Sequence, residues 1–202
     1  MEGKNLLRVF LVRHGETAWN ARGLYQGHSN IPLNGKGRQH ARLAGQKLVG
    51  EGISHIYTSD LRRARETAAI IQEQVGCRKF TLREDLRELN FGALEGLTFA
   101  EVARRFPRQA HCLLTQPEKF LPPGGENVSA LTDRIREGWK DILLHNSTGT
   151  IVVVTHAGPI RLLLGLWLNR GAFWNLSLPH CGIIYASFSA GGGYPRSLIL
   201  NL

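Results

Sequence analysis

The sequence predicts an α/β protein built as a three-layer α/β/α sandwich around a mostly parallel central sheet. Apolar runs typical of strands alternate along the chain with segments of helical periodicity. Residues 150–155 form a continuous β-branched run, which is typical of a parallel strand that is covered on both faces. A length of 202 residues suits one buried core. We therefore expect one domain over residues 1–202, with a helical insert at about 97–145.

The first half of the chain is predicted to contain three strands and two helices. The strands are expected at residues 7–12, 55–59 and 79–82, and the helices at 34–49 and from 60 to about 75. Asn34 and Asp60 are the N-cap candidates, because their side chains accept hydrogen bonds from the free N–H groups of a first turn. Gly50 and Gly52 end the first of these helices.

The second half is predicted to add three helices and three strands. Thr98 and Glu101 form a capping box that begins a helix through Phe106, where Pro107 stops it. The Pro- and Gly-rich segment 115–127 is expected to be a loop. A helix is expected at 128–144, a strand at 150–155, a helix opened by Gly158-Pro159, and a closing hairpin at 182–189 and 197–202.

A cation and an imidazole stand together at the end of the first predicted strand. Arg13 and His14 directly follow the apolar run 9–12, and open α/β sheets bind their ligands at the carboxyl ends of strands. The guanidinium fork suits two phosphate oxygens, and its charge lowers the pKa of a neighbouring histidine, which keeps the imidazole neutral and nucleophilic. The pair indicates a phosphoryl acceptor, although a lone histidine after a strand is often structural.

Further short motifs follow along the chain. After Arg13-His14-Gly15-Glu16 come Thr17, Trp19 and Asn20, then Gln26-Gly27, Pro32-Leu33, Gly37, Ser59-Asp60-Leu61-Arg62-Arg63-Ala64, Glu66-Thr67-Ala68, Leu86-Arg87-Glu88, Phe91-Gly92, Glu95-Gly96, Gly124-Gly125-Glu126 and Thr155-His156-Ala157-Gly158. In that order and at those intervals, the chain resembles the histidine phosphatase superfamily, the phosphoglycerate-mutase-like proteins, over about residues 7–168.

The resemblance implies a phosphohistidine mechanism. His14 matches the histidine that attacks phosphorus and holds a phosphoramidate until water cleaves it. Arg13, Arg63 and His156 match the positions that clamp the phosphoryl oxygens, and Asn20 adds a neutral donor. The family's spacing of four residues after Ser59 selects Arg63, which leaves Arg62 and Arg65 facing outward. Because His156 follows a second apolar strand, the two strand ends must lie side by side.

Three other polar residues have open or secondary roles. Glu88 is the candidate general acid and base for the leaving oxygen, and its alternative is a surface glutamate paired with Arg87. Glu16 is expected to orient a neighbour, since a carboxylate repels phosphate. Gln26 either reaches the substrate or bridges loop backbone groups. The remaining histidines are expected to be structural or solvent-facing: His28, His40, His55, His111, His145 and His180.

Charge and composition favour a small phosphorylated substrate. The formal net charge is +9, which attracts anions. The Lys and Arg residues are dispersed along the chain without a compact run or a recognisable nucleic-acid motif, which argues against nucleic acid as the partner. Both a monomer and a homodimer are compatible with the sequence.

Cysteine and hydropathy patterns indicate a cytoplasmic protein. Cys77, Cys112 and Cys181 are widely spaced, which argues against a disulfide framework and a zinc site. We expect no metal and no cofactor, because the arginine clamp neutralises the phosphate charge. The apolar run 9–12 is too short for a signal peptide, and the uncharged stretch 171–195 is too polar and Gly-rich for a membrane span.

Within the family, the sequence favours hydrolysis over mutase chemistry. Leu89 follows Glu88 where mutases usually have Arg, and the insert is short, so water reaches the intermediate. The segments 123–126 and 156–161 most resemble α-ribazole-5′-phosphate phosphatases of cobalamin biosynthesis. A broad-specificity or sugar-phosphate phosphatase, a phosphoglycerate mutase and an inactive phospho-ligand-binding module are the alternatives. Four apolar residues are expected either to line a leaving-group pocket or to be core: Phe99, Phe106, Phe120 and Leu121.

Overall fold

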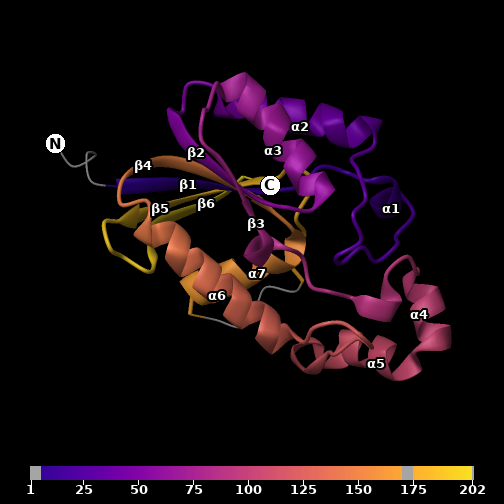
Figure 1. The fold of residues 1–202 in the computed structure, drawn as a ribbon. Helices are drawn as coiled ribbons and strands as arrows, with labels where there is room; N and C mark the ends of the chain where they lie inside the picture. Colours follow the sequence, from indigo (N-terminus) through magenta and orange to yellow (C-terminus); the bar gives the residue numbers. More distant parts are fainter. Residues whose placement is uncertain (1–5, 170–174, 202) are drawn as a thin grey trace.

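A single mixed sheet of six strands forms the centre of the computed structural model, which describes residues 6–169 and 175–201. The strand order is β3-β2-β4-β1-β5-β6 (Figure 1). The strands are β1 (Leu6–Arg13), β2 (Ile53–Ser59), β3 (Phe80–Arg83), β4 (Gly149–Thr155), β5 (Ile183–Ser189) and β6 (Pro195–Asn201). The predicted hairpin is thus confirmed as β5 and β6, which pair antiparallel.

Strand direction explains why the sheet is mostly parallel. β3, β2, β4 and β1 pair in parallel, whereas β5 is antiparallel to β1 and β6 to β5. Only β5 therefore runs against the others. The carboxyl ends of β1, β2 and β4 lie at one edge, and the amino end of β5 begins there too.

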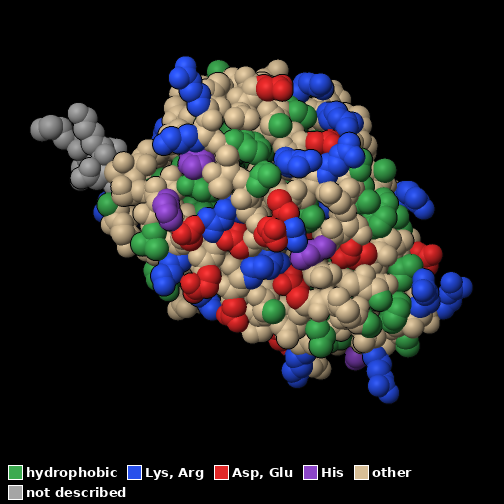
Figure 2. Space-filling view, viewed as in Figure 1, with side chains coloured by type: hydrophobic (Ala, Val, Ile, Leu, Met, Phe, Trp, Pro, Cys, Tyr) green, Lys and Arg blue, Asp and Glu red, His purple; other side chains and the backbone are tan. Residues whose placement is uncertain are grey.

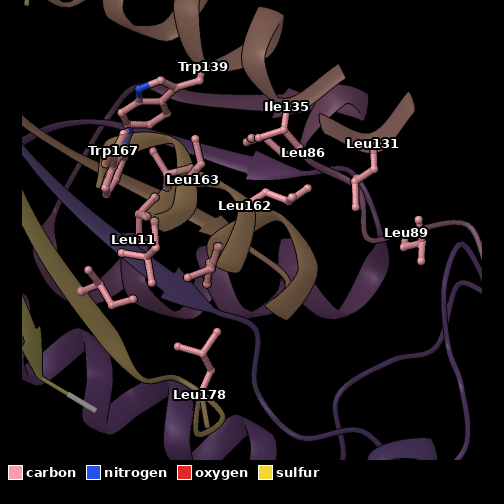
Figure 3. Packing of buried hydrophobic residues seen from close by; sticks show 14 of the residues in the cluster. Leu11, Leu86, Leu89, Leu131, Ile135, Trp139, Leu162, Leu163, Trp167 and Leu178 are labelled. Carbon is pink, nitrogen blue, oxygen red and sulfur yellow. The ribbon is translucent and has the colours of Figure 1, made fainter. Parts of the chain in front are cut away.

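Helices cover both faces of the sheet, which gives the predicted three layers (Figure 1). α2 (Gly35–Leu48) and α3 (Arg62–Val75) pack on one face, and α6 (Val128–Leu144) and α7 (Ala157–Trp167) on the other. Each face has its own buried cluster, because alternate side chains of β1 point to opposite faces: Phe10 and Val12 face α2 and α3, while Val9 and Leu11 face α6 and α7. Figure 3 shows the second cluster, with Leu11, Trp139 and Trp167.

Helices α1 (Ala18–Ala21), α4 (Phe99–Arg105) and α5 (Pro107–Thr115) lie beyond the carboxyl end of β1 (Figure 1). The 3₁₀ helix Glu84–Leu86 directly follows β3, and Gly92–Leu94 and Pro117–Lys119 come before α4 and after α5 in the chain. Thr98 and Glu101 form the predicted capping box of α4. Pro107 ends α4 as predicted, but it also occupies the first position of α5, where its missing N–H has no cost, so residues 107–115 form a helix that the sequence reading missed.

The predicted N-cap Asp60 is wrong. The residue before α3 is Leu61, which is extended and makes no side-chain cap. Asp60 therefore lies one residue too early to reach the first-turn N–H groups, and its carboxylate instead binds the guanidinium of Arg87. Asn34, by contrast, caps α2 as predicted by accepting from the N–H of Gly37 at 2.7 Å. Within residues 6–169 and 175–201, none of the helices has the length and apolar character needed to cross a membrane.

Candidate active site

The carboxyl ends of β1 and β4 bring the two predicted site histidines together. In the parallel register Arg13 is opposite Thr155, and the N–H of His14 donates to the carbonyl of Thr155 at 2.9 Å. The ring centres of His14 and His156 lie 5.0 Å apart, and both side chains are buried. The requirement that the two strand ends lie side by side is therefore met.

The ring of His14 is held in one tautomer. Nδ1 lies 2.7 Å from the carbonyl oxygen of Gly15, which only accepts, so Nδ1 carries the proton and Nε2 keeps its lone pair. Burial lowers the pKa of His14 well below its ordinary value of 6.5, and the charges of Arg63 and Arg13 lower it further. His14 is accordingly neutral at neutral pH, and the lone pair on its Nε2 can attack an electrophile.

Arg63 is the arginine that α3 turns inward. Its side chain is 1% exposed, and its Nη1 and Nη2 donate to the carbonyls of Ser29 (2.9 Å) and Gly27 (2.7 Å). Burial lowers the pKa of Arg63 to about 10, so the guanidinium remains charged at neutral pH. Arg62 lies on the outer face of the helix and pairs with Glu66 at 2.7 Å. The choice of Arg63 over Arg62 from the spacing matches this geometry.

The loop that holds Arg63 is itself held by Glu95. The Glu95 carboxylate accepts from the N–H groups of His28 and Ser29, each at 2.8 Å, and from the Ser29 hydroxyl. Gly27 has a φ of 48°, and a Cβ there would lie 2.1 Å from Glu95 Oε1. Glu95 therefore positions the loop whose carbonyls hold Arg63, a role that could not be predicted from the sequence. The Glu95-Gly96 motif does not indicate which groups the carboxylate contacts.

Arg13 approaches the same place from β1. Its Nη1 donates to the carbonyl of Leu178, in the segment that precedes β5. Burial lowers the pKa of Arg13, and Glu88 opposes that shift, which indicates that the carboxylate is near. Arg13 and Arg63 make no ion pair within residues 6–169 and 175–201. Their charge is therefore left for a ligand.

His156 is fully buried, and only one of its two ring nitrogens has a hydrogen-bond partner among the described residues. Its Nε2 lies 2.9 Å from the hydroxyl oxygen of Ser59, at the end of β2, and its Nδ1 has no partner among the described residues. Burial, then Arg63, lowers the pKa of His156 well below 6.5. The Nε atoms of Arg13 and Arg63 are also buried without a partner in the described part of the chain. Other buried nitrogens of the described residues are also unpaired, such as Trp139 Nε1 and Trp167 Nε1, but those of Arg13, Arg63 and His156 gather around His14. Because most buried polar groups are bonded, this gathering indicates an anion site.

Asn20 and Gln26 meet at the hydroxyl of Thr17. Thr17 caps α1, and its backbone N–H donates to Asn20 Oδ1 at 3.1 Å. The Thr17 hydroxyl lies 2.9 Å from Gln26 Oε1. With both amide oxygens engaged, Nδ2 of Asn20 and Nε2 of Gln26 make no hydrogen bond to the described residues. Gln26 bonds a side chain rather than the loop backbone, and both amide donors are available to a substrate.

Glu88 is fixed against the amino end of α7. Its Oε1 accepts from the N–H groups of Gly158 (3.1 Å) and Leu89 (2.9 Å). Arg134, in α6, donates to the Glu88 carbonyl at 3.2 Å, which fixes the backbone as well. The surface pair with Arg87 that was the alternative for Glu88 is not formed, because Arg87 binds Asp60. Glu88 is thus anchored at the edge of a cavity.

The cavity beside Glu88 has a volume of about 480 Å³. Its lining is mostly apolar and includes Tyr25, Leu89, Phe91, Leu113, Leu114, Pro117, Phe120, Val128, Gly158, Arg161 and Asn175. Of the four residues suggested for such a wall, only Phe120 contributes: Phe106 packs in the core, while Phe99 and Leu121 are exposed. Arg161 is the cation of this wall, and its Nη2 donates to the carbonyl of Leu176 at 2.8 Å.

Glu16 lies beside the site and does orient a neighbour. Its carboxylate accepts from Asn34 Nδ2 at 2.8 Å, and this bond lowers the pKa of Glu16, as does Lys36. In residues 6–169 and 175–201, there is no cluster of three acidic, His or Cys side chains arranged to hold a metal ion. On the face shown in Figure 2, Lys and Arg side chains are interspersed with Asp and Glu rather than gathered into one basic surface.

Known proteins are similar to this chain in sequence and in fold. Phosphoglycerate mutase-like protein 4 of Arabidopsis thaliana is 38% identical over 164 residues, which cover 80% of this chain and 71% of that protein. A mycobacterial glucosyl-3-phosphoglycerate phosphatase superposes with a TM-score of 0.83 at 26% identity, over 96% of this chain and 98% of that one. The α-ribazole phosphatase of Shigella flexneri has a TM-score of 0.86 at 22% identity over 96% of each chain, a likeness of fold.

The family follows from a match that covers almost the whole chain. The family model of the histidine phosphatase superfamily (branch 1) matches residues 9–200, which contain every strand and helix described above except the first residues of β1 and the last of β6. The chain belongs to branch 1 of the histidine phosphatase superfamily, a family of phosphatase and mutase enzymes.

Proposed function

We propose that the protein is a metal-independent phosphomonoesterase that works through a phosphohistidine at His14. The observation that carries the proposal is the ring of His14, whose Nδ1 is held by the Gly15 carbonyl and whose Nε2 keeps a free lone pair. Two guanidinium groups, each with an Nε that is unpaired among the described residues, and a buried second histidine surround His14. The guanidinium groups supply the positive charge that stabilises a phosphoryl group during its transfer.

Each half-reaction uses the same groups. Nε2 of His14 attacks phosphorus, the ester P–O bond breaks, and Glu88 gives its proton to the leaving oxygen. Glu88 then takes a proton from water, the water oxygen attacks phosphorus, and the P–N bond breaks to release inorganic phosphate and neutral His14. Arg13, Arg63 and His156 hold the non-bridging oxygens, and the free amide donors of Asn20 and Gln26 add neutral hydrogen bonds.

The leading substrate is α-ribazole-5′-phosphate. The resemblance of segments 123–126 and 156–161 to α-ribazole phosphatases supports it, and so does the apolar cavity of about 480 Å³ next to Glu88, which suits a flat aromatic leaving group. A cytoplasmic role in cobalamin biosynthesis follows from that substrate. A broad-specificity or sugar-phosphate phosphatase is the alternative.

Arg161 favours a second candidate. A guanidinium in the cavity wall suits a leaving group with its own carboxylate, as in phosphoglycerates and their glycosides. With such a substrate, hydrolysis and mutase transfer compete. Leu89 directly after Glu88 supports hydrolysis, since the mutases that resemble this chain usually have Arg at that position.

Trapping of the intermediate tests the mechanism. Enzyme quenched during turnover is expected to carry phosphate on His14, in a bond that acid cleaves and alkali does not, and mass spectrometry locates it. Activity is expected to persist in excess EDTA, because the cations of the site are arginines. Phosphate found on Ser59, full activity of His14→Ala, or loss of activity in EDTA contradicts the proposal.

A substrate panel distinguishes the candidates. Rates of phosphate release are compared for α-ribazole-5′-phosphate, sugar phosphates and the phosphoglycerates. The highest kcat/KM is expected for α-ribazole-5′-phosphate. A higher value for phosphoglycerates transfers the assignment to the second candidate, and interconversion of 2- and 3-phosphoglycerate faster than phosphate release shows a mutase.

A further inference from the structure

The turn before β5 is bound to the backbone of Arg13. Because β5 is antiparallel, it begins at the edge where β1 ends. The N–H of Arg13 donates to the carbonyl of Gly182 at 3.2 Å, and the N–H of Cys181 donates to the carbonyl of Arg13 at 3.0 Å. Cys181 has a φ of 59°, in the left-handed region that a non-glycine residue seldom adopts. The turn is therefore fixed in place, and its middle residue is His180.

His180 contacts the nucleophile. Its ring centre lies 5.9 Å from that of His14, so the ring of His14 has His156 as one neighbour and His180 as another. Nδ1 of His180 is buried and has no hydrogen-bond partner among residues 6–169 and 175–201. That places it with Arg13 Nε, Arg63 Nε and His156 Nδ1 as an unpaired nitrogen next to His14.

The surroundings keep His180 neutral. Burial and the charge of Arg13 lower the pKa of His180 to about 4, against the opposing effects of the His14 backbone and Glu16; His40 lowers it as well. A neutral imidazole has one N–H, and with the proton on Nδ1 this atom donates while Nε2 accepts. His40 Nδ1 is also buried without a partner among the described residues, so the lack of a partner alone does not mark a site. The contact of the His180 ring with His14 is what distinguishes His180.

We propose that His180 is a third histidine of the active site and donates a hydrogen bond from Nδ1 to a non-bridging oxygen of the phosphoryl group. The inference rests on the proposed phosphohistidine function. It differs from the expectation from sequence, which gave His180 a structural or solvent-facing role. The donor adds no charge to a site that already contains two guanidinium groups, so it binds the trigonal phosphoryl group without holding inorganic phosphate as tightly as a third cation would.

Two substitutions distinguish the effect of losing the N–H donor from the effect of changing the shape of the side chain. His180→Leu removes the N–H and keeps the volume, whereas His180→Asn keeps a neutral donor. The readouts are the inhibition constant for orthovanadate, which adopts the trigonal-bipyramidal geometry of phosphoryl transfer, and kcat/KM with one substrate. His55→Leu is the control, because His55 is a half-buried histidine near the opposite end of β2.

The expected result is a loss of orthovanadate binding and of kcat/KM in His180→Leu, and a recovery of both in His180→Asn. His180→Leu is expected to weaken orthovanadate binding and kcat/KM by about 10- to 100-fold, at or below the lower end of the range for removal of one transition-state donor. His180→Asn is expected to recover most of both, and His55→Leu to change neither. If His180→Leu does not fold, as judged by thermal unfolding, His180→Ala takes its place in the comparison.

Three outcomes overturn the inference, and only the last also overturns the proposed function. If the unsubstituted protein hydrolyses phosphomonoesters while folded His180→Leu keeps its orthovanadate affinity and kcat/KM, the inference about His180 is wrong and the proposed function stands. The inference is also wrong if His180→Asn loses as much as His180→Leu. If the unsubstituted protein neither turns over nor binds orthovanadate, the proposed function falls, and this inference with it.

Discussion

Arg63 keeps a full charge out of water without a carboxylate to pair with. Its two terminal nitrogens have carbonyl partners and its Nε has none in the described part of the chain. A buried charge costs free energy of folding unless it is compensated. In the proposed mechanism a dianionic phosphoryl group supplies this compensation, so the free energy of the interaction contributes to substrate binding and catalysis rather than to folding.

At the residue scale, Arg63→Ala and Arg62→Ala are expected to differ. Arg63→Ala should lower kcat/KM by about 100- to 1,000-fold, the scale of removing one donor to transition-state charge. Arg62→Ala removes only an exposed pair with Glu66 and should change kcat/KM less than twofold. Steady-state kinetics with one phosphomonoester measures both. A larger loss in Arg62→Ala would contradict the assignment of the clamp.

Which residues could be predicted depends on how local their signal is. Arg63 could be selected because the resemblance places the clamp arginine four positions after Ser59, a short interval that spans one strand end and the helix that follows it. Asp60 was misread because an N-cap depends on the backbone angles of a single residue, Leu61, which composition does not reveal. His180 was not identified as a site residue because its contact with His14 depends on the antiparallel entry of β5, far along the chain.

At the scale of elements, the amino end of α7 positions the candidate acid. The N–H of Gly158 donates to Glu88, and the same residue leaves the space in which the carboxylate lies. The helix therefore fixes Glu88 with backbone atoms alone. Sequence analysis located both α7 and Glu88, but no pattern in either segment indicated that they touch.

Gly158→Ala is expected to displace the Glu88 carboxylate. A Cβ at this position would lie 2.2 Å from Glu88 Oε1, so the flexible side chain must move. For alkyl phosphates, whose leaving oxygen needs a proton, kcat should fall by about 10- to 100-fold, and aryl phosphates should slow far less. Gly35→Ala is the control, since a Cβ there meets no atom within 4 Å. Equal slowing of both substrate classes would show that Glu88 is not the proton donor.

At the scale of the whole molecule, the buried histidines link stability to pH. The pKa values of His14 and His156 lie well below 6.5 in the folded protein, mainly because of burial. The unfolded chain therefore binds protons near pH 6.5 that the folded chain does not. Stability is complete above pH 6.5 and is lost as the pH falls through 6.5 towards the folded values.

Urea unfolding between pH 7 and pH 5 tests this linkage. The free energy of unfolding is expected to fall on the acid side of 6.5 by about 1.4 kcal/mol per pH unit for each of His14, His156 and His180, whose pKa values are all lowered in the folded protein. His156→Asn removes one of these contributions and should reduce the slope by about 1.4 kcal/mol per pH unit. The window lies above the range in which Asp60 and Asp141 titrate, because their pKa values are lowered from 3.8. A flat profile, or an unchanged slope in His156→Asn, would contradict the expectation.

The fold class and most elements could be predicted from periodicity, whereas the connections between distant elements could not. Helices α2 and α6 and the closing hairpin match the predicted ranges closely, because their patterns are local. The mixed direction of the sheet, the cavity beside Glu88 and the contacts of Glu95 depend on tertiary packing. That residues 1–202 make one domain stays a prediction.

The position of β1 in the sheet affects how the chain folds during its synthesis. β1 is the first of the six strands in chain order, yet Leu7 pairs with Gly149 on one side and with Phe188 on the other. Pairings this distant in sequence slow folding, and until they form the strand has two open edges that invite aggregation. A nascent chain that ends before β5 has His14 but neither the turn beside it nor the last two strands of the sheet. The site proposed for phosphate transfer is therefore complete only after β5 has been added.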